Sequence, residues 1–165
     1  MPAALLDIDG TLVDSNYHHA AVWDDVLRAN GLAVPRWRLH AAVGIGGDGY
    51  VRAVAGDEVE RRLGDDLREA HGERFAELIG EVRALPGAET LIERLVEAGH
   101  AVVLCSSAGA GEADHYVGLL GVRDAVEWTT SADVDRTKPS PELLEVALGK
   151  AGAKTGVMVG DSVWT

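Results

Sequence analysis

Two aspartates stand one residue apart at the end of a short apolar run near the N-terminus. They are Asp7 and Asp9 in the stretch ALLDIDGTLVDS, which covers residues 4–15. Like charges repel each other, and burying them costs free energy unless a cation or hydrogen bonds compensate. The pair therefore suggests a cation at this position. Whether one is expected depends on which other residues the chain brings to the same place.

Other residues capable of chemistry follow later apolar runs in the same way. Ser106 and Ser107 follow the run His100–Cys105, Lys138 follows the next run by a loop, and Gly160-Asp161-Ser162 follow the last. In an open α/β sheet, groups beyond the carboxyl ends of the strands converge on one edge. Carboxylates suit Mg²⁺ and can attack phosphorus, while hydroxyls and an ammonium can hold phosphate oxygens. The set is typical of phosphoryl chemistry.

The elements that must position these residues alternate between strand and helix. Short aliphatic runs ended by small or polar residues predict buried parallel strands, and the helical patterns between them predict right-handed crossovers. We expect a doubly wound, Rossmann-like α/β sheet. The predicted strands are Ala3–Ile8, His100–Cys105, Ala125–Trp128 and Gly156–Val159. The helices predicted between them are Thr90–Ala98, Glu112–Leu120 and Pro141–Lys150.

The stretch from Ser15 to about Leu85 breaks this alternation. Helical patterns at Tyr17–Asn30, Asp57–Leu63 and Asp65–Gly80, without a convincing strand, predict an inserted helical cap domain. The expected boundaries are 1–14 and 86–165 for the α/β core and 15–85 for the cap. The glycine cluster at 44–49 does not follow a strand, so it predicts a flexible loop rather than a dinucleotide site. Asp48, Tyr50 and Arg52 beside it either line a substrate pocket or pack within the cap.

Composition limits the classes of partner. The 165 residues are 47% hydrophobic and 25% charged, with a mean hydropathy of +0.02, as in an ordinary globular protein. The net charge of -12 repels nucleic acids and anionic membranes. Cys105 is the only cysteine, which excludes an intramolecular disulfide. With no signal peptide and no apolar run of about 20 residues, a cytoplasmic protein is expected.

Four motifs carry a resemblance to a known family. The run Asp7-Ile8-Asp9-Gly10-Thr11, then Ser106, Lys138-Pro139 and Gly160-Asp161-Ser162, resembles the haloacid dehalogenase superfamily. All four motifs stand in the usual order, and the helical insertion is similar to the cap of the phosphoglycolate phosphatase and β-phosphoglucomutase branch. The second aspartate, which dehalogenases and phosphonatases of the family lack, indicates phosphate esters.

The resemblance implies a role for each motif residue. Asp7 would be the nucleophile, and Asp9 would protonate the leaving group and later deprotonate the hydrolytic water. Ser106, Ser107 and Lys138 would bind the transferring phosphoryl group, and Mg²⁺ would be held by Asp7, the backbone carbonyl of Asp9, and Asp161. An acid–base role asks for a raised pKa at Asp9. The implied function is a Mg²⁺-dependent phosphatase that hydrolyses a small phosphorylated metabolite through an aspartyl-phosphate.

Simpler structural explanations remain open for each of these residues. Asp9 with Gly10 can form a turn, Ser106 and Ser107 can end a strand and cap a helix, Lys138 can be a solvated lysine, and Asp161 can lie in a turn. His18 and His19 are adjacent and do not share a helix face, so a surface or hinge role is favoured over metal binding. The alternative functions are a sugar-phosphate mutase that uses the same site, and a non-catalytic remnant that binds a phosphorylated ligand or a protein partner.

The end of the sequence departs from the family pattern. Family members usually continue through another helix, strand and helix, and many carry a second acidic residue near the position of Thr165. The resemblance therefore implies a truncated chain with an exposed sheet edge at Val157–Val159. An unpaired apolar edge favours pairing with another chain, so self-association is expected.

Overall fold

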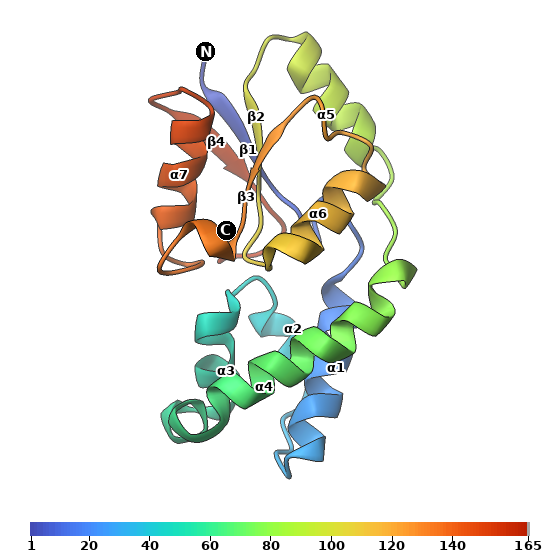
Figure 1. Cartoon of the computed structure of the whole chain (residues 1–165), viewed down its shortest axis with the longest axis vertical. Coiled ribbons are helices and arrows are strands. Elements are labelled where there is room, and N and C mark those ends of the chain that lie inside the picture. Colours follow the sequence, from blue (N-terminus) through green and yellow to red (C-terminus); the bar gives the residue numbers. More distant parts are fainter. Residues whose placement is uncertain (165) are drawn as a thin grey trace.

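The structure is a computed structural model, which describes residues 1–164. Its sheet has four strands in the order β3-β2-β1-β4, and every neighbouring pair is parallel. The strands are β1 (Ala3–Asp7), β2 (Val102–Cys105), β3 (Glu127–Thr129) and β4 (Gly156–Val159). The predicted α/β fold with a parallel sheet is confirmed (Figure 1).

Helices cover both faces of the sheet. On one face, α5 (Ala88–Glu97) and α6 (Ala110–Leu119) place Ile92 and Tyr116 in the cluster that includes Leu6 of β1. On the other face, α7 (Glu142–Lys150) places Leu143 against Leu5. Successive side chains of a strand point to opposite faces, so β1 is buried along its whole length and contributes to both clusters. Its carboxyl end is thereby fixed with Asp7 as the last strand residue.

Four helices form a separate group beside the carboxyl ends of the strands (Figure 1). They are α1 (Asn16–Ala29), α2 (Arg36–Ala42), α3 (Gly47–Ala55) and α4 (Asp57–Leu78), followed by a short 3₁₀ turn at Ile79–Glu81. The sequence pattern indicated neither α2 nor α3, and the prediction of a wholly loop-like glycine cluster is wrong because α3 begins at Gly47. The predicted break between Leu63 and Asp65 is also wrong, since α4 continues through Gly64.

The chain enters and leaves this helical group at one place. Val13 forms an antiparallel bridge with Ala84, and the flanking backbone adds two hydrogen bonds. The Asp14 N–H donates to the Arg83 carbonyl at 2.9 Å, and the Leu85 N–H donates to the Leu12 carbonyl at 2.8 Å. The two adjacent crossings therefore form one short ribbon that connects the chain of the helical group to that of the sheet.

The last strand lies at the edge of the sheet. Val157 and Val159 of β4 are 60% and 44% exposed, so the apolar edge expected from the sequence is present within residues 1–164. Self-association through it stays a prediction. Thr165, the position discussed for a second acidic residue, lies outside the described residues. Among the described helices, none has the length and apolar character needed to cross a membrane.

Candidate functional site

Asp7 and Lys138 form a buried ion pair at the carboxyl end of β1. The Lys138 ammonium donates to Asp7 Oδ1 at 2.5 Å and to the Cys105 carbonyl at 3.1 Å. The side chains of the pair are each only 5% exposed. The Ile8 N–H also donates to Asp7 Oδ1, at 3.0 Å. Lys138 is therefore not a solvated lysine, and the structure joins the residues of two motifs that lie 131 positions apart.

Asp9 lies beside this pair and has its own set of partners. The Ser15 hydroxyl donates to Asp9 Oδ1 at 2.6 Å, and His19 Nε2 lies 3.3 Å from the same oxygen. The Ser106 hydroxyl reaches Asp9 Oδ2 at 3.5 Å. Ser15 and His19 are four residues apart at the start of α1, so they share a helix face and both point at Asp9. The two aspartates therefore do not share one positively charged partner: Asp7 has Lys138, and Asp9 has His19.

The two carboxyl groups have pKa values shifted in opposite directions. Burial raises the pKa of Asp7 from 3.8 to about 6, against the opposing charge of Lys138. Burial also disfavours the Asp9 charge, but hydrogen bonding and attraction from His19 outweigh it and lower the pKa of Asp9. The sequence-based expectation of a raised pKa at Asp9 is therefore wrong. The carboxyl group with the raised pKa is that of Asp7, because His19 gives Asp9 a close cation and Asp9 therefore has a lowered pKa.

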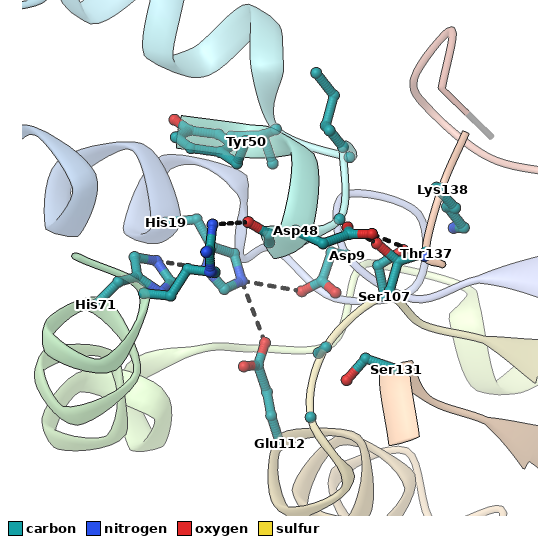
Figure 2. Close-up of a pocket in the computed structure, with 18 of the residues that line it drawn as sticks. Asp9, His19, Asp48, Tyr50, His71, Ser107, Glu112, Ser131, Thr137 and Lys138 are labelled. Atoms are coloured by element: carbon teal, nitrogen blue, oxygen red, sulfur yellow. Dashed lines mark hydrogen bonds and ion pairs between the residues drawn. The ribbon is translucent and has the colours of Figure 1, made fainter. Parts of the chain in front are cut away.

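His19, for which the sequence favoured a surface or hinge role, is instead a mostly buried candidate for function, with its side chain 13% exposed. Its Nε2 lies 3.3 Å from both Asp9 Oδ1 and Glu112 Oε1, and its Nδ1 lies 3.4 Å from His71 Nε2 (Figure 2). Burial opposes a charge on His19, yet the two carboxylates raise its pKa to about 10. Burial and the His19 charge lower the pKa of His71 to about 3, so His71 is neutral. The signal that could have located His19 was its i+4 spacing from Ser15.

Asp9, His19 and Glu112 also form a group that could hold a metal ion. Their ligand atoms lie within 4.8 Å of one another. The group mixes one imidazole nitrogen with two carboxylates, whereas Mg²⁺ prefers oxygen ligands. With His19 protonated, the imidazolium itself supplies the positive charge between the two carboxylates.

The two predicted phosphoryl-binding serines differ in their surroundings. Ser106 is fully buried, and its hydroxyl accepts a hydrogen bond from the Ala108 N–H at 3.0 Å. The Ser107 hydroxyl is buried without a hydrogen-bond partner among residues 1–164, and Ser107 lines the adjacent cavity. A buried polar group normally has a partner, so the Ser107 hydroxyl is free to bind a ligand oxygen.

Asp161 lies against the loop that follows Asp9. Its Oδ2 accepts a hydrogen bond from Asn16 Nδ2 at 2.7 Å, and its Oδ1 lies 3.4 Å from the Thr11 hydroxyl. A Cβ placed on Gly10, where φ is +73°, would come within 2.4 Å of Asp161 Oδ2. A side chain at position 10 would therefore displace Asp161, and the left-handed backbone there also favours glycine.

A cavity of about 510 Å³ lies between the sheet and the helical group. Asp7, Asp9, Ser107 and Lys138 line it from the sheet side, whereas Ser106 and Asp161 are not among its lining residues. The helical group contributes Asp48 and Tyr50, two of the three residues considered for a pocket, while Arg52 is mostly exposed and pairs with Asp57 instead. The cavity is also lined by His19, Trp23, Arg68 and His71 of the helical group and by Glu112 of α6. The arrangement brings two carboxylates, an ammonium and an imidazole to one cavity, a set that could act as nucleophile and acid–base groups.

Comparison with known proteins decides the family. The sequence profile of the haloacid dehalogenase-like hydrolases matches residues 1–165. The chain belongs to this family. The predicted superfamily and enzyme class, a phosphoric monoester hydrolase, are thereby confirmed.

Individual relatives of this haloacid dehalogenase-like hydrolase are moderately similar. Phosphoglycolate phosphatase of Rhodobacter capsulatus is 28% identical over 166 residues, which cover 98% of this chain and 76% of that protein. A hydrolase from Pseudomonas syringae is 29% identical, with a TM-score of 0.89 over 99% of this chain and 77% of that one. A β-phosphoglucomutase from Clostridium difficile has a TM-score of 0.83 at 18% identity, covering 98% and 77%, and shows a shared fold alone.

Proposed function

We propose that this hydrolase is a Mg²⁺-dependent phosphatase of small phosphorylated metabolites, with Asp7 as the nucleophile. The buried Asp7–Lys138 pair at the wall of the cavity carries the proposal. A carboxylate beside an ammonium can attack phosphorus while the ammonium attracts the phosphoryl oxygens. The phosphatase name of the Rhodobacter capsulatus relative supports the same reaction class.

The proposed reaction has two steps at Asp7. In the first, a carboxylate oxygen of Asp7 forms a bond to phosphorus, the bond to the leaving oxygen breaks, and that oxygen takes a proton. Asp9 is ionised and His19 is protonated, so the available proton is the one on His19 Nε2, 3.3 Å from Asp9 Oδ1. In the second, water attacks phosphorus, the bond between Asp7 and phosphorus breaks, and inorganic phosphate leaves. Asp9 accepts the proton of that water and passes it to His19, which restores the starting state. Ser107 and Lys138 hold the phosphoryl oxygens in both steps.

The residues at the end of β1 fit a magnesium ion. Both hydrogen bonds to the Asp7 carboxylate fall on Oδ1, so no residue of the described chain donates to Oδ2. Asp161 lies against Gly10, next to Asp9, and offers further carboxylate oxygens. We assign the ion to Asp7, the Asp9 carbonyl and Asp161, an oxygen-only set of the kind Mg²⁺ prefers. Bound there, Mg²⁺ would neutralise charge on the transferring phosphoryl group.

The helical group would act as the cap over the substrate. We place the domain boundaries at 1–14 and 86–165 for the core and 15–85 for the cap, where the two crossings of the chain lie side by side. A cavity of about 510 Å³ suits a small metabolite. 2-Phosphoglycolate is the first substrate to test, because a relative is named for it.

Phosphate release tests the proposal. Wild type is assayed with 2-phosphoglycolate and other phosphorylated metabolites, with Mg²⁺ and with excess EDTA, and Asp7→Asn is the matched control. We expect Mg²⁺-dependent release of one inorganic phosphate per substrate consumed, abolished by Asp7→Asn. Consumption of a sugar phosphate without inorganic phosphate would instead identify the mutase, and binding without turnover would identify the non-catalytic alternative.

A further inference from the structure

The start of α3 lies directly on the loop that carries Lys138. The Gly46 N–H donates to the Lys138 carbonyl at 3.1 Å. The Asp48 carboxylate accepts two hydrogen bonds from Thr137: Oδ2 from the N–H at 3.2 Å, and Oδ1 from the hydroxyl (Figure 2). We call these four residues the clasp. It joins the helical group to the sheet 89 positions further along the chain.

The clasp is tightly packed at Gly46. A Cβ placed on Gly46 would lie 1.5 Å from the Thr137 hydroxyl oxygen, so the backbone at position 46 approaches as closely as a glycine allows. Arg68 of α4 donates to the Gly47 carbonyl at 3.2 Å and pairs with Glu60. The Gly46–Asp48 segment is therefore bonded to its own helical group and would move with that group.

Lys138 lies on a loop whose other backbone contacts are mostly local, such as the hydrogen bonds of Arg136 to Glu142 and of the Ser140 N–H to the Thr137 carbonyl. It lies between the 3₁₀ turn Ser131–Asp133 and the start of α7 at Glu142. Its ammonium is nevertheless buried and bonded to Asp7. Burying an ammonium is favourable only in good geometry with a partner, so a small shift of this loop would weaken the pair. The clasp holds the backbone at the two positions that set this geometry, Thr137 and Lys138.

From this geometry we infer that Asp48 is a positioning residue, which sets the Lys138 ammonium against Asp7 when the helical group closes on the sheet. The inference deepens the proposed phosphatase function and rests on it. The active pair is then completed only in the closed form, in which the cavity is shielded from water. Closure over the substrate would then also position the Lys138 ammonium beside Asp7.

A direct contact between Asp48 and substrate is the competing interpretation, because Asp48 also lines the cavity. Both of its carboxylate oxygens, however, accept hydrogen bonds from Thr137. Its negative charge would also repel the phosphate of a substrate. The contacts therefore favour a role that acts through Thr137 and Lys138.

Four variants separate the two interpretations by steady-state kinetics with Mg²⁺ and the substrate identified for wild type. They are Asp48→Asn, Thr137→Val, the double variant, and the conservative Thr137→Ser. A hydrogen bond to a charged group corresponds to roughly a tenfold change or more, so we expect kcat to fall by about that factor in either single variant, by more than any rise in KM. The double variant should be no slower than the slower single variant, and Thr137→Ser should retain wild-type kcat.

Hydrogen–deuterium exchange supplies a readout that does not depend on activity. The Thr137 N–H should exchange faster in Asp48→Asn than in wild type, seen in peptides that cover residues 135–140, while peptides from β1 stay protected. A KM effect confined to Asp48→Asn, additive losses in the double variant, or unchanged exchange would overturn the inference. If wild type hydrolyses no phosphate ester, the proposed function fails, and the exchange experiment still decides whether Asp48 holds this loop.

Discussion

Replacing the proposed nucleophile with asparagine should make the protein more stable at neutral pH. Asp7 is 3% exposed, and burial raises its pKa from 3.8 to about 6 even with Lys138 beside it. The folded state therefore opposes ionisation of Asp7 by about 2 pKa units, and one unit corresponds to about 1.4 kcal/mol. Asparagine has nearly the same shape, keeps an oxygen for the Lys138 ammonium and carries no charge. We expect Asp7→Asn to raise the free energy of unfolding by about 3 kcal/mol at pH 7.

The pH dependence of this difference has a definite sign. Between pH 3.8 and about 6 the folded state keeps the Asp7 proton, whereas the unfolded chain has lost it. Wild-type stability contributed by this group therefore falls as pH rises through that window. The variant lacks the group, and other titrating groups cancel in the comparison to first order. The two proteins should be nearly equal at pH 4, and the advantage of the variant should grow up to about pH 6 and level off towards pH 7.

Urea unfolding at several pH values, in buffers with EDTA, measures this difference. Asp25→Asn, at an exposed aspartate, is the matched control and should change the free energy of unfolding by less than about 0.5 kcal/mol. At pH 7 the thermal midpoint of Asp7→Asn should rise by roughly 6–12 °C. A variant that is less stable than wild type at pH 7, or a difference that does not grow between pH 4 and pH 7, would refute the reasoning.

Three further outcomes follow from single side chains. His19→Gln removes the proposed proton donor and the cation beside Asp9, so steady-state assays should show a fall in kcat, and the pKa of Asp9 should rise. Asp24 is 1% exposed and bonds to two arginines, so Asp24→Asn should lower the free energy of unfolding by about 1–3 kcal/mol in urea titrations. Cys105 is fully buried, and burial raises its pKa to about 11. Iodoacetamide at pH 7.5 should therefore label it only after unfolding, as mass spectrometry would show.

β1 and β2 were predictable because they are short, aliphatic, buried along their whole length and ended or followed by a polar residue. β3, with the sequence Glu-Trp-Thr, lacks this pattern and begins two residues later than expected. β4 has the predicted bounds, and β1 ends one residue earlier than expected. Burial on both faces excludes polar side chains from such strands, which gives them a clear sequence pattern. The sheet edge on which the motif residues meet follows from parallel topology alone, so the approach of Lys138 to Asp7 could be anticipated.

The helices of the inserted group were harder to predict from the sequence. α3 begins at Gly47 and also contains Gly49, although glycine destabilises a helix interior by about 1 kcal/mol. Contacts outside the helix compensate, since its first turn is bonded to Thr137 and Tyr50 stacks on Trp23. Local propensity carries no information about partners that lie 89 residues away. The same limit explains why the clasp was not foreseen.

The error at Asp9 has the same origin. The acid–base role alone called for a raised pKa, but the direction depends on which charges lie close to the carboxyl. His19 and Glu112 are 93 positions apart, and only the folded chain brings both close to Asp9. His19 then carries the proton that Asp9 was expected to carry.

The charges around the cavity explain why a cation is needed for the proposed reaction. Five carboxylates line it, those of Asp7, Asp9, Asp48, Glu112 and Asp135. The lining cations are Lys138, protonated His19 and Arg68, and each of them is already bonded to carboxylates. A phosphate ester would add about two further negative charges, which the cavity as it stands would repel. A divalent cation at Asp7 and Asp161 would reverse the sign of the field where the phosphate binds. The two aspartates of the opening motif can thus lie close together because each has its own counterions. Asp7 has Lys138 and the proposed metal ion, and Asp9 has His19.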